Sequence, residues 1–385
     1  MKLFKSLLVA PATLGLLAPL SATANNINLV DVNTYSSSEE VKNISEFNSA
    51  DLAVTNGRVD GLEARLNEFE AGSFSETTTA SFSADFAIGV EDEDGYATSY
   101  DALKTFYGFQ IDLNTSFTGE DSLDVSIDAG TGGGGLSELD LNDIGSDSAL
   151  GVDGVSYTFP VGNVTMFVGA DTDGSLLYNT ACVYGGPSNT LDDCGNQFSA
   201  LGAGSAAAGA SFEIGNGFDV AVGYTGDGVG NGLLTSEGLD SYGGQLTYTA
   251  DSFGASVTYA LIEGASTTDT TYYALNGYWT PDETGTVPSI SVGYETADPE
   301  NTTTDSTQWF VGLQWDEMGP GTLGTAIGTT GSIAENAEET LMYEAFYSYS
   351  VNDGMTITPL VYMKEVSTVG VEDETGVMVK TSFSF

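Results

Sequence analysis

Apolar and polar side chains alternate along much of the chain, most clearly in its last nine residues. Val377, Val379, Thr381, Phe383 and Phe385 point to one side of an extended strand, and the residues between them point to the other. The same alternation recurs at 82–90, 107–117, 123–128, 218–224, 242–249, 308–315 and 341–350, and more weakly near 154–161, 163–170, 206–214, 252–262, 271–280, 287–296, 321–328 and 354–365. With the closing strand, the pattern predicts sixteen strands and an all-β fold.

The segments between these strands alternate in length. Short turns lie at 117–121, 160–163, 215–217, 250–252, 281–286, 318–321 and 351–354, and long loops at 91–105, 129–153, 171–205, 225–240, 263–270, 297–306, 329–340 and 366–375. An even number of strands with all long loops at one end is typical of an antiparallel transmembrane β-barrel. A soluble sandwich gives no reason for this segregation.

The two faces of the predicted strands differ in chemistry. Aromatic residues near strand ends, including Trp279, Trp309, Trp315, Phe383 and Phe385, share the apolar face, as in a membrane-interface girdle. The alternative is that aromatics are simply common in strands. The other face carries acids, which we predict to line a water-filled pore: Asp85, Asp112, Asp124, Asp128, Asp219 and Glu344. Any one of them is also expected as an ordinary solvated residue of a wide lumen.

The N-terminal region has three parts. Residues 1–24 have a basic start, an apolar core and the small-residue sequence Ala22-Thr23-Ala24, which predicts a signal peptide and therefore export. Residues 25–48 form a polar linker. Heptad spacing of apolar residues in 49–71 predicts a short coiled-coil stalk helix, with a single helix lying on the domain as the alternative. The barrel is expected over 73–385.

The chain is strongly acidic, with 55 acidic residues, 8 basic residues, no His and a net charge of −47. Nine acids precede Ser73, so 55 − 9 = 46 remain, against Lys104, Lys364 and Lys380. This charge disfavours nucleic acid and anionic lipid and attracts cations, although solubility in a salty medium also accounts for part of it. Without His, the common acid/base and nucleophilic mechanisms are missing, and no enzymatic activity is expected.

Two loops of the predicted barrel are candidates for a constriction. One is the glycine-rich 129–153 and the other is 171–205, where Cys182 and Cys194 of an exported chain are expected to form a disulfide. The pattern does not choose between them. No cofactor is expected, but acidic loop segments such as 91–95 and 171–174 suit weak Ca²⁺ binding. The alternative function is therefore a secreted or surface-exposed Ca²⁺-binding adhesion protein, which would not need detergent for extraction.

Four segments carry a resemblance to a known family: Met1-Lys-Leu-Phe4, the stalk 56–65, the strand 79–86 and the aromatic C-terminus. In these the chain resembles the major outer-membrane porins of cyanobacteria, related to the carbohydrate-selective porins. The resemblance implies a sixteen-stranded homotrimer in outer-membrane lipid for passive uptake of small hydrophilic solutes, variously sugars, ions or iron. Larger relatives carry a wall-binding domain before the stalk, and residues 25–48 are too few for one.

Overall fold

The computed structural model describes most of the predicted barrel domain. The described residues are 77–92, 102–131, 136, 138–139, 141, 149–230, 232–235, 238–264, 269–283, 285–300, 304–368 and 370–385. The predicted signal peptide, linker and stalk (1–24, 25–48 and 49–71) lie outside them and stay predictions. Among the described residues, no helix has the length and apolar character needed to cross a membrane.

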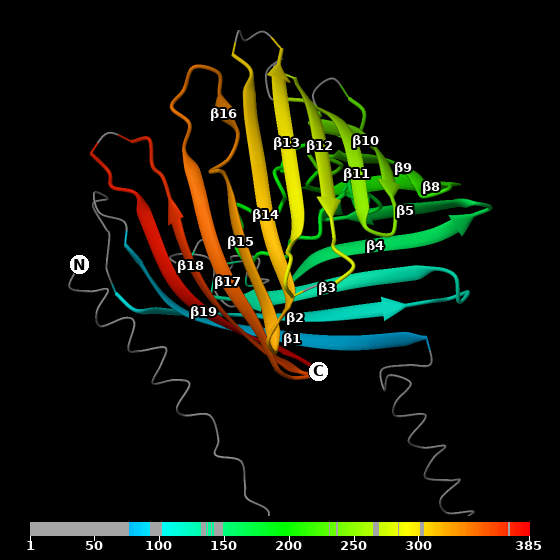
Figure 1. Cartoon of the computed structure of the whole chain (residues 1–385). Coiled ribbons are helices and arrows are strands. Elements are labelled where there is room, and N and C mark those ends of the chain that lie inside the picture. Colours follow the sequence, from blue (N-terminus) through cyan, green and yellow to red (C-terminus); the bar gives the residue numbers. More distant parts are fainter. Residues whose placement is uncertain are drawn as a thin grey trace, which may run out of the picture. The chain divides into compact units, whose positions relative to one another are not determined.

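The described residues form one antiparallel barrel of sixteen principal strands (Figure 1). These are β1 (Thr78–Asp92), β2 (Lys104–Thr115), β3 (Ser122–Gly130), β4 (Gly151–Val161), β5 (Val164–Ala170), β8 (Ala206–Gly215), β9 (Phe218–Gly226), β10 (Asp240–Thr249), β11 (Phe253–Ile262), β12 (Thr270–Trp279), β13 (Ser289–Pro299), β14 (Ser306–Met318), β15 (Gly321–Thr329), β17 (Leu341–Asn352), β18 (Met355–Lys364) and β19 (Glu374–Ser384). The count of sixteen strands is confirmed.

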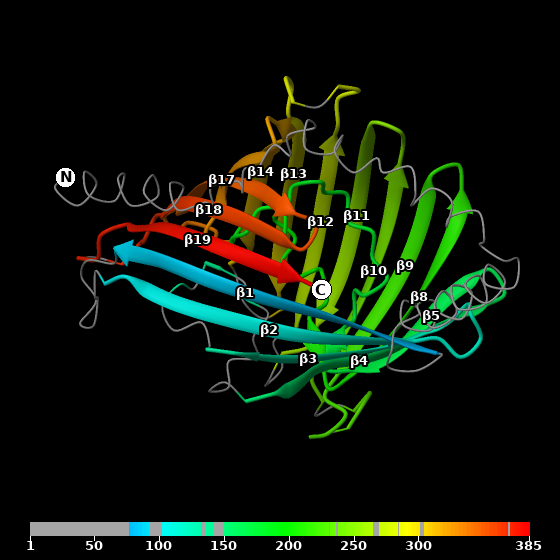
Figure 2. The same cartoon turned by 90° about the horizontal axis from the view of Figure 1, so that it is seen from below.

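The barrel is closed by its first and last strands. β1 pairs with β2 on one side and with β19 on the other, with Phe86 opposite Thr381 and Ala84 opposite Phe383 (Figure 2). Three two-residue strands are accessory. β6 (Thr172–Asp173) pairs with β7 (Ala203–Gly204), and β16 (Ile333–Ala334) pairs with β14.

The predicted alternation of short turns and long loops is also present. Short connections such as 162–163 and 216–217 join β4 to β5 and β8 to β9, while 171–205 joins β5 to β8. Gly162 and Gly217 have positive φ angles of 66° and 84°, which glycine adopts without steric cost in a tight turn. The local sequence at these turns therefore explains why the strands reverse there.

The outer face of the barrel is apolar and exposed. Val222, Val257 and Leu275 are each more than half exposed, although they lie in the middle of their strands. Six strands carry two outward aromatic residues six positions apart: Phe218 and Tyr224, Tyr242 and Tyr248, Phe253 and Tyr259, Tyr273 and Trp279, Trp309 and Trp315, and Tyr343 and Tyr349. An even spacing keeps both rings on one face, and six positions cover about 20 Å of strand.

Candidate functional site

The segment 171–205, here called the inserted loop, runs inside the ring of strands (Figure 2). Alternate backbone amides of its extended part donate hydrogen bonds to inward side chains of successive strands. Asn179 N lies 2.7 Å from Gln245 Oε1, Ala181 N 3.0 Å from Ser256 Oγ, Val183 N 3.0 Å from Ser291 Oγ and Gly185 N 2.9 Å from Gln314 Oε1. The inward side chains of β10, β11, β13 and β14 thus satisfy a backbone that has no sheet partner there.

The returning half of the inserted loop is also fixed to the wall. Glu295, on β13, accepts hydrogen bonds from the Phe198 and Ser199 amides, at 3.2 and 2.7 Å, and from the Ser199 hydroxyl at 2.6 Å. Asn276 Nδ2, on β12, donates to the Cys194 carbonyl at 2.9 Å. A carboxylate that accepts several N–H groups can remain buried, so Glu295 anchors the loop.

Inward glycines let the inserted loop approach the wall closely. A methyl group at Gly293 would overlap the Cys194 carbonyl oxygen, and one at Gly223 would overlap the Gly174 carbonyl oxygen. The same holds less severely at Gly154, where a methyl group would lie 2.9 Å from the Asp171 carbonyl oxygen. Because only glycine leaves this space, these positions form a track on which the loop backbone lies.

Behind the inserted loop the barrel interior is an apolar core. Cys182 and Cys194 form a disulfide within the loop. The core contains buried residues of the loops 131–150 and 171–205 and of the wall strands β1, β14, β15, β17, β18 and β19: Ala87, Leu136, Leu139, Leu141, Tyr184, Leu191, Cys194, Phe310, Ala326, Met342, Phe346, Leu360, Tyr362 and Met378. Both loops that the sequence offered as constrictions therefore contribute residues inside the barrel.

Lys364 ties these loops to the wall, whereas Lys104 of β2 pairs with Glu91 of the neighbouring wall strand β1. Lys364 Nζ, on β18, lies 2.5 Å from Glu138 Oε1 and 3.2 Å from Thr190 Oγ1, so it joins both inserted segments. Lys104 Nζ lies 3.5 Å from Glu91 Oε2. Both carboxylates are almost completely buried. Two of the three lysines that follow Ser73 are thus engaged with buried acids.

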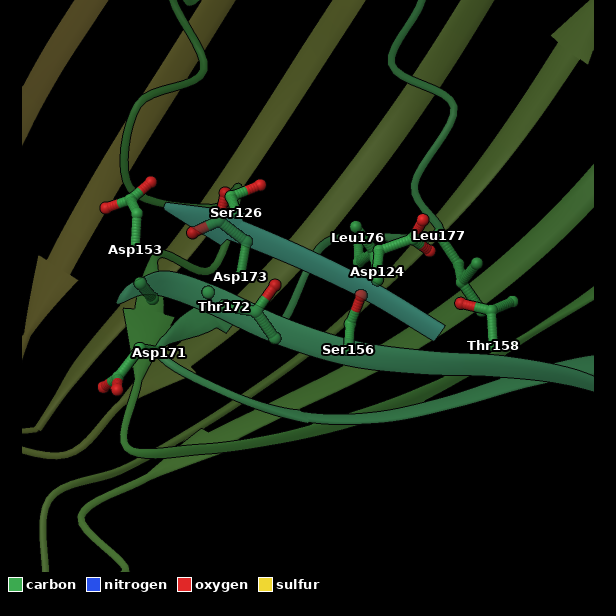
Figure 3. Close-up of a pocket in the computed structure, with 12 residues that line it drawn as sticks. Asp124, Ser126, Asp153, Ser156, Thr158, Asp171, Thr172, Asp173, Leu176 and Leu177 are labelled. Atoms are coloured by element: carbon green, nitrogen blue, oxygen red, sulfur yellow. The ribbon is translucent and has the colours of Figure 1, made fainter. Parts of the chain in front are cut away.

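Away from this apolar core, an open cavity of about 510 Å³ lies between the inserted loop and strands β3 and β4 (Figure 3). The wall strands β3 and β4 contribute Asp124, Ser126, Asp153, Ser156 and Thr158, and the inserted loop contributes Asp171, Asp173, Leu176 and Leu177. No lysine or arginine is among the lining residues. Desolvation inside the barrel, together with the charge of Asp153, raises the pKa of the Asp173 carboxyl above its ordinary value.

The six acids predicted to line a pore share the inner face but have different surroundings. Asp85, Asp128 and Glu344 are buried, and Glu344 accepts a hydrogen bond from Tyr184 Oη at 2.5 Å beneath the inserted loop. Asp112, Asp124 and Asp219 are partly exposed. Only Asp124 of the six lines the cavity. The residues that join it, Asp153, Asp171 and Asp173, lie in or beside segments that the sequence assigned to external loops.

The five predicted girdle aromatics occupy the outer face. Trp309 Nε1 donates to Glu339 Oε1 at 2.7 Å near the long-loop end, whereas Phe385 stacks on Phe82 at 5.8 Å near the short-turn end. Phe383 contacts Phe86 edge to face, and Trp279 is opposite Ile290. Trp315 is opposite Leu323. As for metals, the described part of the chain holds no group of three or more acidic, Cys or His side chains placed to bind an ion.

Comparison with known proteins identifies the fold. No protein-family model matches the chain. OprB of Pseudomonas putida superimposes with a TM-score of 0.60 at 10% identity, covering 85% of this chain and 97% of that one. A mutant of the Rh. blastica porin gives a TM-score of 0.54 at 14% identity, covering 80% and 100%. The chain therefore has the sixteen-stranded porin barrel fold.

One relative is found at the level of sequence. An uncharacterized protein of Nostoc sp. strain PCC 7120 is 38% identical over 146 residues, which are 37% of this chain and 23% of the relative. The match thus spans about a quarter of the relative's length.

Proposed function

We propose that the protein is an outer-membrane channel through which small hydrophilic solutes diffuse, with a preference for cations. The observation that carries this proposal is the cavity beside the inserted loop, where Asp124, Asp153, Asp171 and Asp173 gather without a lysine or arginine. Fixed negative charges in a narrow passage raise the local concentration of cations and lower that of anions. The porin barrel fold supports a diffusion path through the barrel.

The arrangement of the lysines supports the same selectivity. General diffusion channels need an opposing basic surface to create a transverse field, yet Lys104 and Lys364 are paired with the buried Glu91 and Glu138. The charge of Lys364 is therefore used to hold the inserted segments, and that of Lys104 to join β2 to β1. The passage retains a net negative field.

The outer surface supports placement in a bilayer. The paired aromatics lie about 20 Å apart along their strands, and they bound an outward apolar stretch as the aromatic girdles of outer-membrane barrels bound the apolar band. Exposed aliphatic residues such as Val257 and Leu275 fill the space between the two levels. Trp279, Trp309, Trp315, Phe383 and Phe385 would then contact the lipid interface.

The resemblance to cyanobacterial porins also bears on assembly, and we propose a homotrimer.

Sugars, which the same resemblance implies, are a second candidate solute besides inorganic ions. One observation favours them: Phe198 of the inserted loop stacks on Tyr272 of β12, with ring centroids 5.4 Å apart. Phe198 is partly exposed within the barrel, and such a ring can contact the apolar face of a sugar.

Reconstitution in a planar bilayer tests the proposal. Under a KCl gradient, we expect stepwise conductance and a reversal potential of the sign given by K⁺ permeation. The preference should weaken at high salt, because the screening length falls from about 10 Å at 0.1 M to about 3 Å at 1 M. A reversal potential of the opposite sign would contradict the cation preference, and the absence of conductance would contradict the channel itself.

Charge placed on the outer face tests the membrane orientation of the barrel. Val257→Lys puts a charge at a mid-strand outward position, where the bilayer should oppose it by about 2–4 kcal/mol of unfolding free energy. Thr165→Lys, which faces inward on β5, should cost much less. Urea unfolding in liposomes measures both. Equal effects would mean that the outer face does not contact lipid.

A further inference from the structure

The loop between β9 and β10 folds outward, in contrast to the inserted loop. Ser241 and Gly243 pair with the inward positions Thr225 and Gly223 of β9, so the alternate residues Asp240 and Tyr242 face outward. Asp240 is nevertheless only 1% exposed. Tyr224 Oη donates to its Oδ1 at 2.5 Å, and the Leu234 amide donates to its Oδ2 at 3.0 Å. The loop therefore covers the outer wall.

The loop is packed against small outward residues of this wall. Leu233 lies beside Gly226 and Gly228: a methyl group at Gly226 would lie 3.0 Å from Leu233 Cδ2, and one at Gly228 would lie 3.3 Å from it. Gly228 N also donates to Ser205 Oγ at 2.8 Å. These contacts fix the described part of the loop on β8, β9 and β10.

This packing leaves four aliphatic side chains on the surface: Val229, Leu233, Leu234 and Leu239. Leu234 is 71% exposed even though its own amide is held by Asp240. Its φ of 57° is a left-handed conformation that leucine rarely adopts. We call these four residues the outer aliphatic patch.

We propose that the outer aliphatic patch inserts into the apolar part of the outer leaflet and anchors the barrel at this edge. The patch continues the outer band beyond the rings of Tyr224 and Tyr242, which lie 5.5 Å apart. Its described residues include no lysine or arginine, so the chemistry favours acyl chains over phosphate groups. Asp227 and Asp240, the acids described there, accept hydrogen bonds from loop amides. The inference rests on the proposed membrane insertion.

Fluorescence quenching by lipid tests this inference. The described residues contain no free cysteine and the two in the sequence are paired, so Leu234→Cys can be labelled selectively with an environment-sensitive fluorophore. In liposomes we expect its emission to shift to shorter wavelength and to be quenched by doxyl-labelled phospholipid. Glu338→Cys, on an exposed part of another long loop, should show neither effect.

A second labelled variant separates this inference from the proposed function. Val257→Cys reports on the middle of the outer band. Quenching at residue 257 without quenching at 234 would overturn the anchoring role and leave the membrane barrel intact. Loss of quenching at both would overturn both. A blue-shifted label at 234 that lipid does not quench, together with cross-linking of the unlabelled Leu234→Cys variant to a second copy, would assign the patch to a subunit contact instead.

Discussion

Replacing Asp153, Asp171 and Asp173 by asparagine is expected to abolish most of the preference for cations. Asp153 lines the cavity from β4, and Asp171 and Asp173 line it from the inserted loop; no lysine or arginine is among the lining residues. A unit charge about 6 Å from a passing ion contributes about 0.7 kcal/mol in water, or about a threefold change in ion occupancy. The triple variant should therefore move the reversal potential most of the way to that of a neutral channel, with a small change in stability.

The matched control keeps the change in net charge and moves it away from the cavity. Neutralising three exposed acids that do not line the cavity, Asp298 near the end of β13 and Glu335 and Glu338 between β16 and β17, removes the same charge without altering the cavity. If this variant loses selectivity to the same extent, the total charge of the protein sets the preference and the cavity does not. Acidification should act in the same direction as the substitutions, because the raised pKa of Asp173 makes it take up a proton before ordinary carboxyls.

Most of the barrel could be predicted, because the alternation of apolar and polar residues that marks a strand is visible within a few residues. The closing strand and the turns at 162–163 and 216–217 needed only local pattern, and their predicted limits fall within three residues of the structure. Gln245 and Gln314 likewise lie at positions that the alternation at 242–249 and 308–315 predicts to face inward. Their hydrogen bonds to the inserted loop bridge 66 and 129 positions, and no local pattern reports such distances.

The path of the inserted loop could not be predicted from the sequence, although two features of the strand pattern indicate that a segment lies inside the barrel. Phe310, Met342 and Phe346 are apolar at positions that alternation predicts to be inward and polar. Such residues need a partner inside the barrel, and the loops supply it. Glycines at inward positions, such as Gly293, are the second signal, because they mark where another backbone approaches.

Gly293→Ala is expected to displace the inserted loop and to reduce the conductance of the open channel. The added methyl group would overlap the Cys194 carbonyl oxygen, so the disulfide-bonded part of the loop must move away from the wall. The hydrogen bond from Asn276 to that carbonyl would be lost, and overpacking of this kind costs about 1–3 kcal/mol. Since the inserted loop lies against the wall, its movement away from the wall brings it further into the passage and narrows the passage.

Single-channel recording and urea unfolding measure the two consequences. We expect smaller, noisier current steps and a lower unfolding midpoint for Gly293→Ala. Gly244→Ala, on the outer face of β10, is the control, because its methyl group would meet no atom closer than 3.4 Å. It introduces the same side chain into a strand without touching the loop, and its conductance should stay unchanged. Equal current steps in the two variants would mean that the contact between Gly293 and Cys194 does not set the width of the passage, even if Gly293→Ala alone is less stable.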